Sequence, residues 1–325
     1  MFQRCYSIAR NTFIETVRQP IYGVVLLATA GLLVLNVSLA AFTLEDDNKL
    51  LLDLGLSTLL LSGLFLSAFS ATGVLSREIE DRTVLTVISK PISRPVFFLG
   101  KFLGLLAAVL LAYYLSALVF VLAQRHGVLQ NSSDPWDAPV LVLGCTSVGI
   151  ALLAAAFANY FYGKHFGAAA ITFVTPLLTV AVLAVGFFDK HFAPVAFGSK
   201  YVGGQVLIAA YLVMLAVIVT SAVALAASTR FKQVMTLLIC TFVVGVGIAS
   251  DWIFGQYTAT SFAASIAYHI VPNIGPFWVI DGLHAASEET AVPVQYALLA
   301  SAYALLITAA TVGVGIAALQ KREVG

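Results

Sequence analysis

The hydrophobic positions of this chain fall into long runs that short polar segments separate. Each run has about twenty residues or more, the length that an α-helix needs to cross about 30 Å of hydrocarbon. The pattern therefore predicts an all-α polytopic membrane protein with one transmembrane domain over residues 1–325. We expect eight spans, at residues 21–43, 51–75, 96–124, 138–160, 166–188, 203–228, 233–253 and 294–319.

Composition supports this class. The chain is 60% hydrophobic and only 10% charged, whereas a soluble domain has about 25% charged residues. The net charge of +1 and the dispersed basic residues give no sign of a nucleic-acid partner. Three cysteines lie far apart without a CxxC motif, so neither a disulfide framework nor a zinc site is indicated.

The distribution of basic residues predicts the orientation. When the eight spans are threaded in order, all but four of the 17 Lys and Arg residues fall on the side of the N-terminus; the four are Lys49, Arg125, Lys190 and Lys200. The positive-inside rule then places both termini in the cytoplasm of a multi-pass inner-membrane protein. The pair of runs within 138–188 is separated by only five residues, so a re-entrant pair is an alternative to two full spans.

Residues 1–20 are too polar to span. Phe2, Tyr6, Ala9, Phe13 and Val17 share one helical face. Three arginines lie on the other faces, at Arg4, Arg10 and Arg18. This pattern predicts an amphipathic helix in the membrane interface. A signal peptide cleaved after Ser38-Leu39-Ala40 is the competing interpretation, against which the long preceding segment argues.

The longest predicted outer segment, 254–293, is rich in aromatic residues and in Pro and Gly. Its apolar stretch Phe262–Val271 is too short to span. We expect short interfacial or re-entrant helices there. They would form either a lid over the outer end of a pathway or a loop packed on the bilayer surface.

Between the second and third predicted spans lies Arg77–Lys101, REIEDRTVLTVISKPISRPVFFLGK, which mixes acidic and basic residues. Apolar residues at positions 79, 84, 87 and 88 can share one face of a short helix. Pro91 ends that helix, and Pro95 begins the next one. The segment predicts either a short cytoplasmic helix offered to a soluble partner or an ordinary basic loop.

The sequence contains no motif for nucleotide binding or catalysis. It has no GxxxxGK[ST] loop for a nucleotide, no HExxH motif and no catalytic constellation. No ionisable residue lies in the middle of a predicted span, which disfavours a gradient-driven transporter. We therefore expect no enzyme and no cofactor in this chain, and a second chain as the source of energy.

The order of an amphipathic N-terminal helix, two spans, the segment SREIEDRTVLTVISKPISRPVFFLGKF and a further span resembles the permease subunits of ABC-2 type ATP-binding-cassette transporters. The turn Ser228–Val234, the Pro272-Asn273 region and the basic tail after the last span are similar to later parts of that family. Within SREIEDRTVLTVISKPISRPVFFLGKF, the residues that match the family are Glu78, Glu80, Lys90, Pro91, Ser93, Arg94, Gly100 and Lys101.

The chain departs from the usual six-span plan by two spans, and segments 138–160 and 166–188 look like an insertion before the family's fourth span. This difference puts a substrate pathway taken from six-span members in doubt. By this resemblance, the first, second and seventh predicted spans would form the interface between the two permeases.

The resemblance implies a specific assembly: two cytoplasmic ATPase subunits that hold ATP and Mg²⁺, and a second permease subunit, identical or related. Residues 77–95 would be the coupling segment, residues 1–20 the membrane elbow, and the chain would export or move a substrate. The residues implied in ATPase binding are Arg77, Glu78, Glu80, Asp81, Arg82, Thr83, Leu85, Lys90 and Arg94.

Two other functions stay open at this point. The chain could pass ATPase motion to an extracytoplasmic partner without transporting anything, or it could be a gradient-driven secondary transporter. A secondary transporter would predict symmetry between the two halves and an ionisable residue in a broken helix at mid-membrane, and the sequence has neither.

Overall fold

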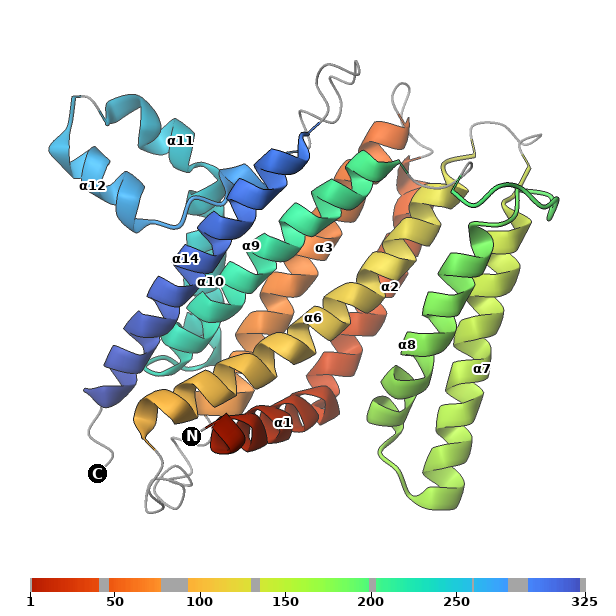
Figure 1. The fold of residues 1–325 in the computed structure, drawn as a ribbon, viewed down its shortest axis with the longest axis horizontal. Coiled ribbons are helices and arrows are strands. Elements are labelled where there is room, and N and C mark those ends of the chain that lie inside the picture. The colour runs from red at the N-terminus through yellow and green to blue at the C-terminus, as the bar shows by residue number, and fades with distance from the viewer. Residues whose placement is uncertain are drawn as a thin grey trace. The chain divides into compact units, whose positions relative to one another are not determined.

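The computed structural model describes residues 2–40, 47–76, 93–129, 135–198, 203–258, 260–279 and 292–321. Over these residues the chain is helical, with one isolated antiparallel bridge between Phe188 and Pro194 (Figure 1). The long helices are α1 (Phe2–Arg18), α2 (Pro20–Ala40), α3 (Asp47–Ala71), α6 (Arg94–His126), α7 (Ala138–Tyr162), α8 (Phe166–Val185), α9 (Gly204–Ser228), α10 (Gln233–Ile248) and α14 (Val294–Gln320). The short ones are η1 (Thr72–Ser76), α11 (Ser250–Ile253), η2 (Gly255–Tyr257), α12 (Phe262–Ile270) and η3 (Gly275–Phe277).

Seven helices in the described part of the chain are long and apolar enough to cross a membrane. They correspond to seven of the eight predicted spans, and α7 and α8 are two separate helices of 25 and 20 residues. The all-α polytopic membrane class is therefore confirmed.

The predicted span at 233–253 differs from a single straight helix. It consists of α10 followed by α11 and η2, with a bend of 67° between the two parts. The carbonyl of Gly247, near the end of α10, accepts the backbone N–H of Ile274 at 3.0 Å. A Cβ at Gly247 would lie 2.6 Å from Cγ1 of Ile274. A loop packed this closely on α10 takes a carbonyl that a continuing helix would use, so the helix stops there.

The chain divides into two compact units. Unit 1 comprises Met1–Thr16, Leu60–Leu110 and Ile208–Gly325, and unit 2 comprises Val17–Leu59 and Leu111–Leu207. Helices α3 and α6 contribute residues to both units.

Helix α9 is the most buried helix of unit 1. In its most apolar stretch 67% of the residues are buried, against 28% for α14. Its sequence is apolar on all sides, as expected of a helix that other helices surround. Tyr211, in the second turn of α9, hydrogen bonds Ser301 in the second turn of α14 at 2.7 Å. Near the other end of α14, Arg230 donates to the carbonyl of Ala318 at 3.0 Å. The two helices therefore run parallel.

Helix α3 packs against α9 through small residues. A Cβ at Gly63 would lie 2.8 Å from Cγ1 of Val217, and one turn further the hydroxyls of Ser67 and Ser221 are 2.8 Å apart. Small residues let two membrane helices approach closely, and a buried hydroxyl pair satisfies both side chains. Asn36, in unit 2, is also buried and donates to Thr58 at 3.2 Å. Because small and hydroxylated residues allow helices to approach closely, the sequence predicts that Asn36, Ser57, Ser62, Ser67 and Ser70 face helix–helix interfaces. Asn36, Ser67 and Ser70 are at most 4% exposed, whereas Ser57 and Ser62 are only half-buried.

In unit 2, helices α7 and α8 form a hairpin. Their mutual contact is made by small residues, with Ala155 and Ala158 of α7 against Ala169 of α8. Gly163 ends α7 with φ of +61°, and its N–H bonds back to the carbonyls of Ala158 and Asn159. A glycine takes this left-handed conformation without strain, which explains the sharp reversal.

The N-terminal helix α1 lies against the first turns of α6, within unit 1. A Cβ at Gly100 would be 2.8 Å from Cβ of Ile8, and a Cβ at Gly104 would overlap the carbonyl oxygen of Ala9 and lie 2.6 Å from Cβ of Thr12. The two glycines are four residues apart, so they lie on one face of α6 and leave a flat strip for the crossing helix.

The packed face of α1 differs from the apolar face that the periodicity suggested. The side toward α6 carries Cys5, Ile8 and Thr12, whereas Phe2 and Tyr6 are 86% and 62% exposed. A helix that crosses another at glycine distance must present short side chains, which excludes the aromatic ones. The exposed aromatic side suits contact with lipid, and an interfacial position for α1 stays a prediction.

We expect the substitution Gly104→Ala to destabilise the protein, because the added methyl group meets the backbone of α1, which cannot yield without moving the helix. Such overpacking costs about 1–3 kcal/mol, more than the helix propensity that alanine restores. The matched control is Gly149→Ala in α7, where nothing lies within 4 Å of the new atom. Thermal unfolding in detergent should show a lower Tm for G104A and an unchanged or higher Tm for G149A; equal values for the two variants would contradict the crossing.

Candidate functional site

The segment predicted to meet a soluble partner lies largely outside the described residues. Of its named positions, Arg94 is described. The other named positions lie outside the described residues: Arg77, Glu78, Glu80, Asp81, Arg82, Thr83, Leu85 and Lys90. The structure describes the two helix ends that flank this segment. They are η1 before it and the start of α6 after it.

Arg94 is held by the C-terminal end of α14. Its Nη1 donates to the carbonyls of Gln320 at 2.6 Å and Leu319 at 3.4 Å. These carbonyls belong to the last turn of α14, where no further helical N–H is present to bond them. The positive guanidinium also lies at the negative end of the helix dipole. Arg94 therefore ties α6 to α14, and contact with a soluble partner stays a prediction for it.

The same end of α14 is bonded a second time. Arg230, in the turn between α9 and α10, donates from Nη2 to the carbonyl of Ala318. One turn before, Gly315 packs against the ring of Phe98 in α6, so that a Cβ there would be 3.0 Å from two ring carbons. The start of α6, the end of α9 and the end of α14 thus meet at one end of unit 1, with α1 on the first turns of α6.

The other flank of the segment is the end of α3, which winds into a π-helix, η1. Its residues Val74 and Leu75 are fully buried, and η1 contacts α10. Thr72 donates its hydroxyl to the carbonyls of Ala68 at 3.1 Å and Phe69 at 2.9 Å. A π-helical turn adds a residue per turn, and such turns are frequent at functional sites. Both flanks of the predicted coupling segment are therefore packed into unit 1.

Lys101 lies two turns into α6 and is buried, with 5% exposure. Its ammonium group is 4.0 Å from the carboxylate of Glu15 on α1 and 5.7 Å from the centre of the Phe97 ring. Because Lys101 lies near the start of a predicted span, the sequence predicts that its side chain reaches the interface. The structure instead places it against α1, where an opposite charge and a ring face lower the cost of burying it. The arginines of the predicted elbow, Arg4, Arg10 and Arg18, are exposed on α1.

A second polar site lies at the opposite end of unit 1, around Asp251. Its Oδ1 accepts the hydroxyl of Tyr268 at 2.8 Å and the side-chain amide of Asn273 at 3.0 Å. The backbone N–H of Asn273 donates to the hydroxyl of Tyr303 on α14 at 2.9 Å, and Tyr296 of α14 donates to the carbonyl of Pro276 at 2.7 Å. These bonds, together with the Ile274–Gly247 bond, hold the segment with α12 and η3 to α10, α11 and α14.

The Asp251 carboxylate raises the pKa of Tyr268, chiefly because the phenol donates its hydrogen bond to it, with burial as a smaller cause. The folded protein therefore holds this proton more tightly than the unfolded chain does. The bond stabilises the fold below about pH 10, the usual pKa of tyrosine, and this contribution is lost as the pH rises through the raised value.

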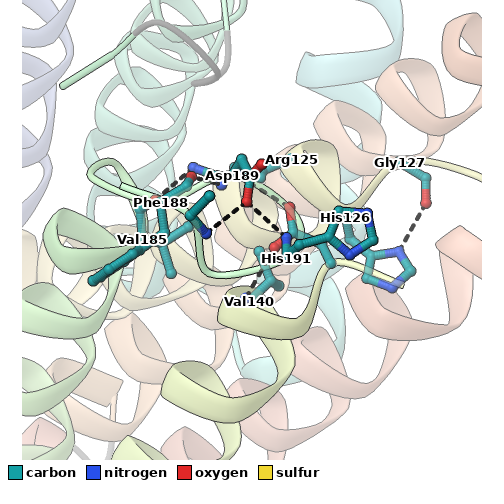
Figure 2. Close-up of polar contacts among 10 residues, drawn as sticks. Arg125, His126, Gly127, Val140, Val185, Phe188, Asp189 and His191 are labelled. Atoms are coloured by element: carbon teal, nitrogen blue, oxygen red, sulfur yellow. Dashed lines mark hydrogen bonds and ion pairs between the residues drawn. The ribbon is translucent and has the colours of Figure 1, made fainter. Parts of the chain in front are cut away.

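Unit 2 contains a buried ion pair that sequence reasoning missed. Arg125, near the end of α6, has a side chain that is 2% exposed, and that of Asp137 is 1% exposed. Nε of Arg125 donates to Oδ2 of Asp137 at 3.2 Å. Its other nitrogens donate to the carbonyls of Val185 at 2.6 Å and Phe188 at 2.5 Å, at the end of α8 (Figure 2). One guanidinium thus joins the end of α6, the start of α7 and the end of α8.

Asp137 has a second role, because its Oδ1 accepts the N–H of Val140 and caps the start of α7. A capping signal was present in the sequence, since an aspartate stands just before an alanine–proline pair at the start of an apolar run. The partner twelve residues away could not be recognised, because an arginine in the last turn of a helix usually reaches water.

The described residues contain no group of three or more His, Cys, Asp or Glu side chains that could hold a metal ion. The three cysteines are free thiols. Searches of protein-family models, of curated proteins and of solved structures find no match to this chain. What the chain does is therefore inferred from its own residues and their geometry.

The Arg125–Asp137 pair predicts strong coupling between the two residues. Asp137→Ala should destabilise the protein by about 3–5 kcal/mol, because it leaves a buried guanidinium without its counter-charge. Arg125→Leu should cost a similar amount. The double variant should lose less than the sum, since neither charge then remains unpaired. Thermal or denaturant unfolding of the four proteins in detergent measures the cycle, and additive losses would refute the pairing.

Tyr268→Phe should loosen the segment from α11 to η3, because it removes the phenol that bonds Asp251. A hydrogen bond to a charged group is worth about 1.5–3 kcal/mol when buried, and solvent screening should reduce this one to about 1 kcal/mol. Limited proteolysis should then cut this segment several-fold faster. Tyr257→Phe is the matched control, since the ring of Tyr257 is 53% exposed in the same segment. Equal cleavage of both variants and the parent would count against the bond.

Proposed function

We propose that this chain is the transmembrane permease subunit of an ABC-2 type ATP-binding-cassette transporter. ATP hydrolysis in two separate cytoplasmic subunits would drive it to export or otherwise move a substrate. A second permease, identical or related, would complete the membrane part. The proposal begins from the resemblance of SREIEDRTVLTVISKPISRPVFFLGKF and its neighbouring spans to that family, and the helical membrane architecture agrees with it.

The observation that carries the proposal is the anchoring of both flanks of the predicted coupling segment. On one side the chain leaves from η1, whose Val74 and Leu75 are fully buried. On the other it returns at Arg94, which holds the last carbonyls of α14, and at Phe98, which is also fully buried. A segment suspended between two packed helix ends transmits a displacement to them, whereas a segment on long free linkers would absorb it.

The connections of α6 extend this transmission. Its first turns carry α1 on Gly100 and Gly104, and they pack on α14 at Gly315. A push on residues 77–92 would therefore reach α1, α3, α6 and α14 together. Packed helices respond by shifting between discrete arrangements rather than by bending continuously, which is what a transporter that alternates between two states requires.

No nucleotide-binding loop is present in the sequence, so ATP and Mg²⁺ would belong to the partner subunits. The acidic cluster at Glu78, Glu80 and Asp81 is the feature of the segment best suited to basic residues on an ATPase. The predicted location is the inner membrane, with both termini in the cytoplasm. In unit 1, α1, the start of α6 and the end of α14 lie at one end, as that topology requires.

A mechanical role without transport is favoured by one feature of the opposite end. The network of Asp251, Asn273 and Tyr303 links the segment from α11 to η3 internally and joins it to α14. That segment exposes large side chains, with Trp252 at 75% and Phe262 at 83%. A rigid, aromatic projection of this kind could pass ATPase-driven motion to an extracytoplasmic partner. Stimulation of the ATPase by such a protein, and not by a soluble solute, would favour this role over transport.

The double reversal Glu78→Lys/Glu80→Lys should release the ATPase while the permease stays folded, because it replaces both acidic charges by repulsive ones. The assay is a pull-down of the tagged protein from its native membrane in mild detergent. Glu288→Lys/Glu289→Lys, a pair of glutamates in the predicted outer segment, is the matched control and should retain the ATPase. Retention by E78K/E80K would exclude these glutamates from the contact, and a well-folded parent that brings down no ATPase would overturn the permease function.

A further inference from the structure

The tripeptide Lys-His-Phe occurs twice in this chain, at Lys164–Phe166 and Lys190–Phe192, once at each end of α8. Two aromatic residues precede each copy, Phe161-Tyr162 in one case and Phe187-Phe188 in the other. Helix α8 has 20 residues and is therefore about 30 Å long, which matches the thickness of the hydrocarbon core. We therefore expect the two copies at the two edges of the hydrocarbon.

The residue before each copy makes them electrostatically different. Asp189 precedes the second copy and accepts the backbone N–H groups of His191 and Ala193 at 2.8 and 2.9 Å (Figure 2). Gly163 precedes the first copy. Between Ala138 and Phe188 the sequence contains no Asp or Glu at all. The turn between α7 and α8 therefore carries positive charge that no acid of the hairpin balances, whereas the other end of α8 carries its own carboxylate.

The turn is a fixed structure. The N–H groups of Gly163 and Lys164 bond back to the last carbonyls of α7. The side-chain amide of Asn159 donates to the carbonyl of Lys164 at 2.6 Å. Around it, Tyr160 is 83% exposed and Tyr162 is 71% exposed. Lys164 and His165 are exposed as well. The ammonium group and the imidazole are thus exposed on the turn, and two exposed phenols on different sides of the last turn of α7 flank them.

This combination suits the head group of a phospholipid. Tyrosines lie at the level of the head groups, with the ring in the apolar layer and the hydroxyl in the polar one. Lysines near the membrane surface attract anionic lipids by about 1 kcal/mol each, and the imidazole adds an N–H donor for a phosphate oxygen. We propose that the α7–α8 turn, through Lys164, His165, Tyr160 and Tyr162, binds the head group of an anionic phospholipid in the leaflet that it faces.

The test measures lipid binding to the full chain by native mass spectrometry, with phosphatidylglycerol and phosphatidylcholine as the two probes. The double variant Lys164→Ala/His165→Ala should bind phosphatidylglycerol about fivefold more weakly or worse, since loss of one lysine alone removes about that much. Phosphatidylcholine binding should be unchanged. Lys164→Arg/His165→Arg keeps the donors and adds charge, so it should bind phosphatidylglycerol at least as well as the parent.

The chain provides its own control in the second copy. Lys190→Ala/His191→Ala removes the same two side chains beside Asp189, and it keeps the backbone bonds in which both residues take part. It should leave phosphatidylglycerol binding as in the parent. Equal losses in the two double variants would mean that any surface lysine serves and would overturn the site. Unchanged binding in K164A/H165A would overturn it directly.

Discussion

The carbonyl groups in the last turn of a helix have no helical N–H to accept, so they need donors from elsewhere. In this protein arginines from other parts of the chain supply the missing donors. Arg94 and Arg230 bond the last turn of α14, and Arg125 bonds the end of α8. The planar guanidinium presents five donors in a fixed fork and can reach carbonyls that lie apart, whereas a lysine has three donors on one nitrogen.

These contacts decide how the helices are grouped. Arg94 and Leu319 are 225 residues apart in the chain, yet their bond makes the first turn of α6 and the last turn of α14 one piece. Gly315, packed on Phe98, fixes the same two helices one turn away. In unit 2 the Arg125 contacts set the ends of α7 and α8 on the end of α6 in the same way. Charge at helix ends and glycine at helix crossings together hold each unit.

The two units use this arrangement differently. In unit 1 the linked helix ends flank residues 77–92, so a soluble partner that moves this segment would act on a connected group of helices. In unit 2 the α7–α8 hairpin is bonded through Arg125 at the end remote from its turn, and the turn itself is exposed on all sides. The hairpin is thus bonded to protein along α8 and at the end remote from its turn, and lipid bound at the turn would hold its other end.

The sequence by itself determined the class, the number of long apolar segments and their bounds to within a few residues, because helix length and apolar content are local properties that the thickness of the bilayer fixes. It also indicated Pro95 at a helix start. Only the tertiary structure decided which face of α1 packs, that the span at 233–253 breaks after Gly247, and that Arg125 meets Asp137. Each of these depends on an atom that another part of the chain supplies, such as the glycine strip of α6, the N–H of Ile274 or the carbonyls of α8. A hydrophobic pattern indicates how much of its surface a helix buries, but it does not identify the residues that pack against that surface.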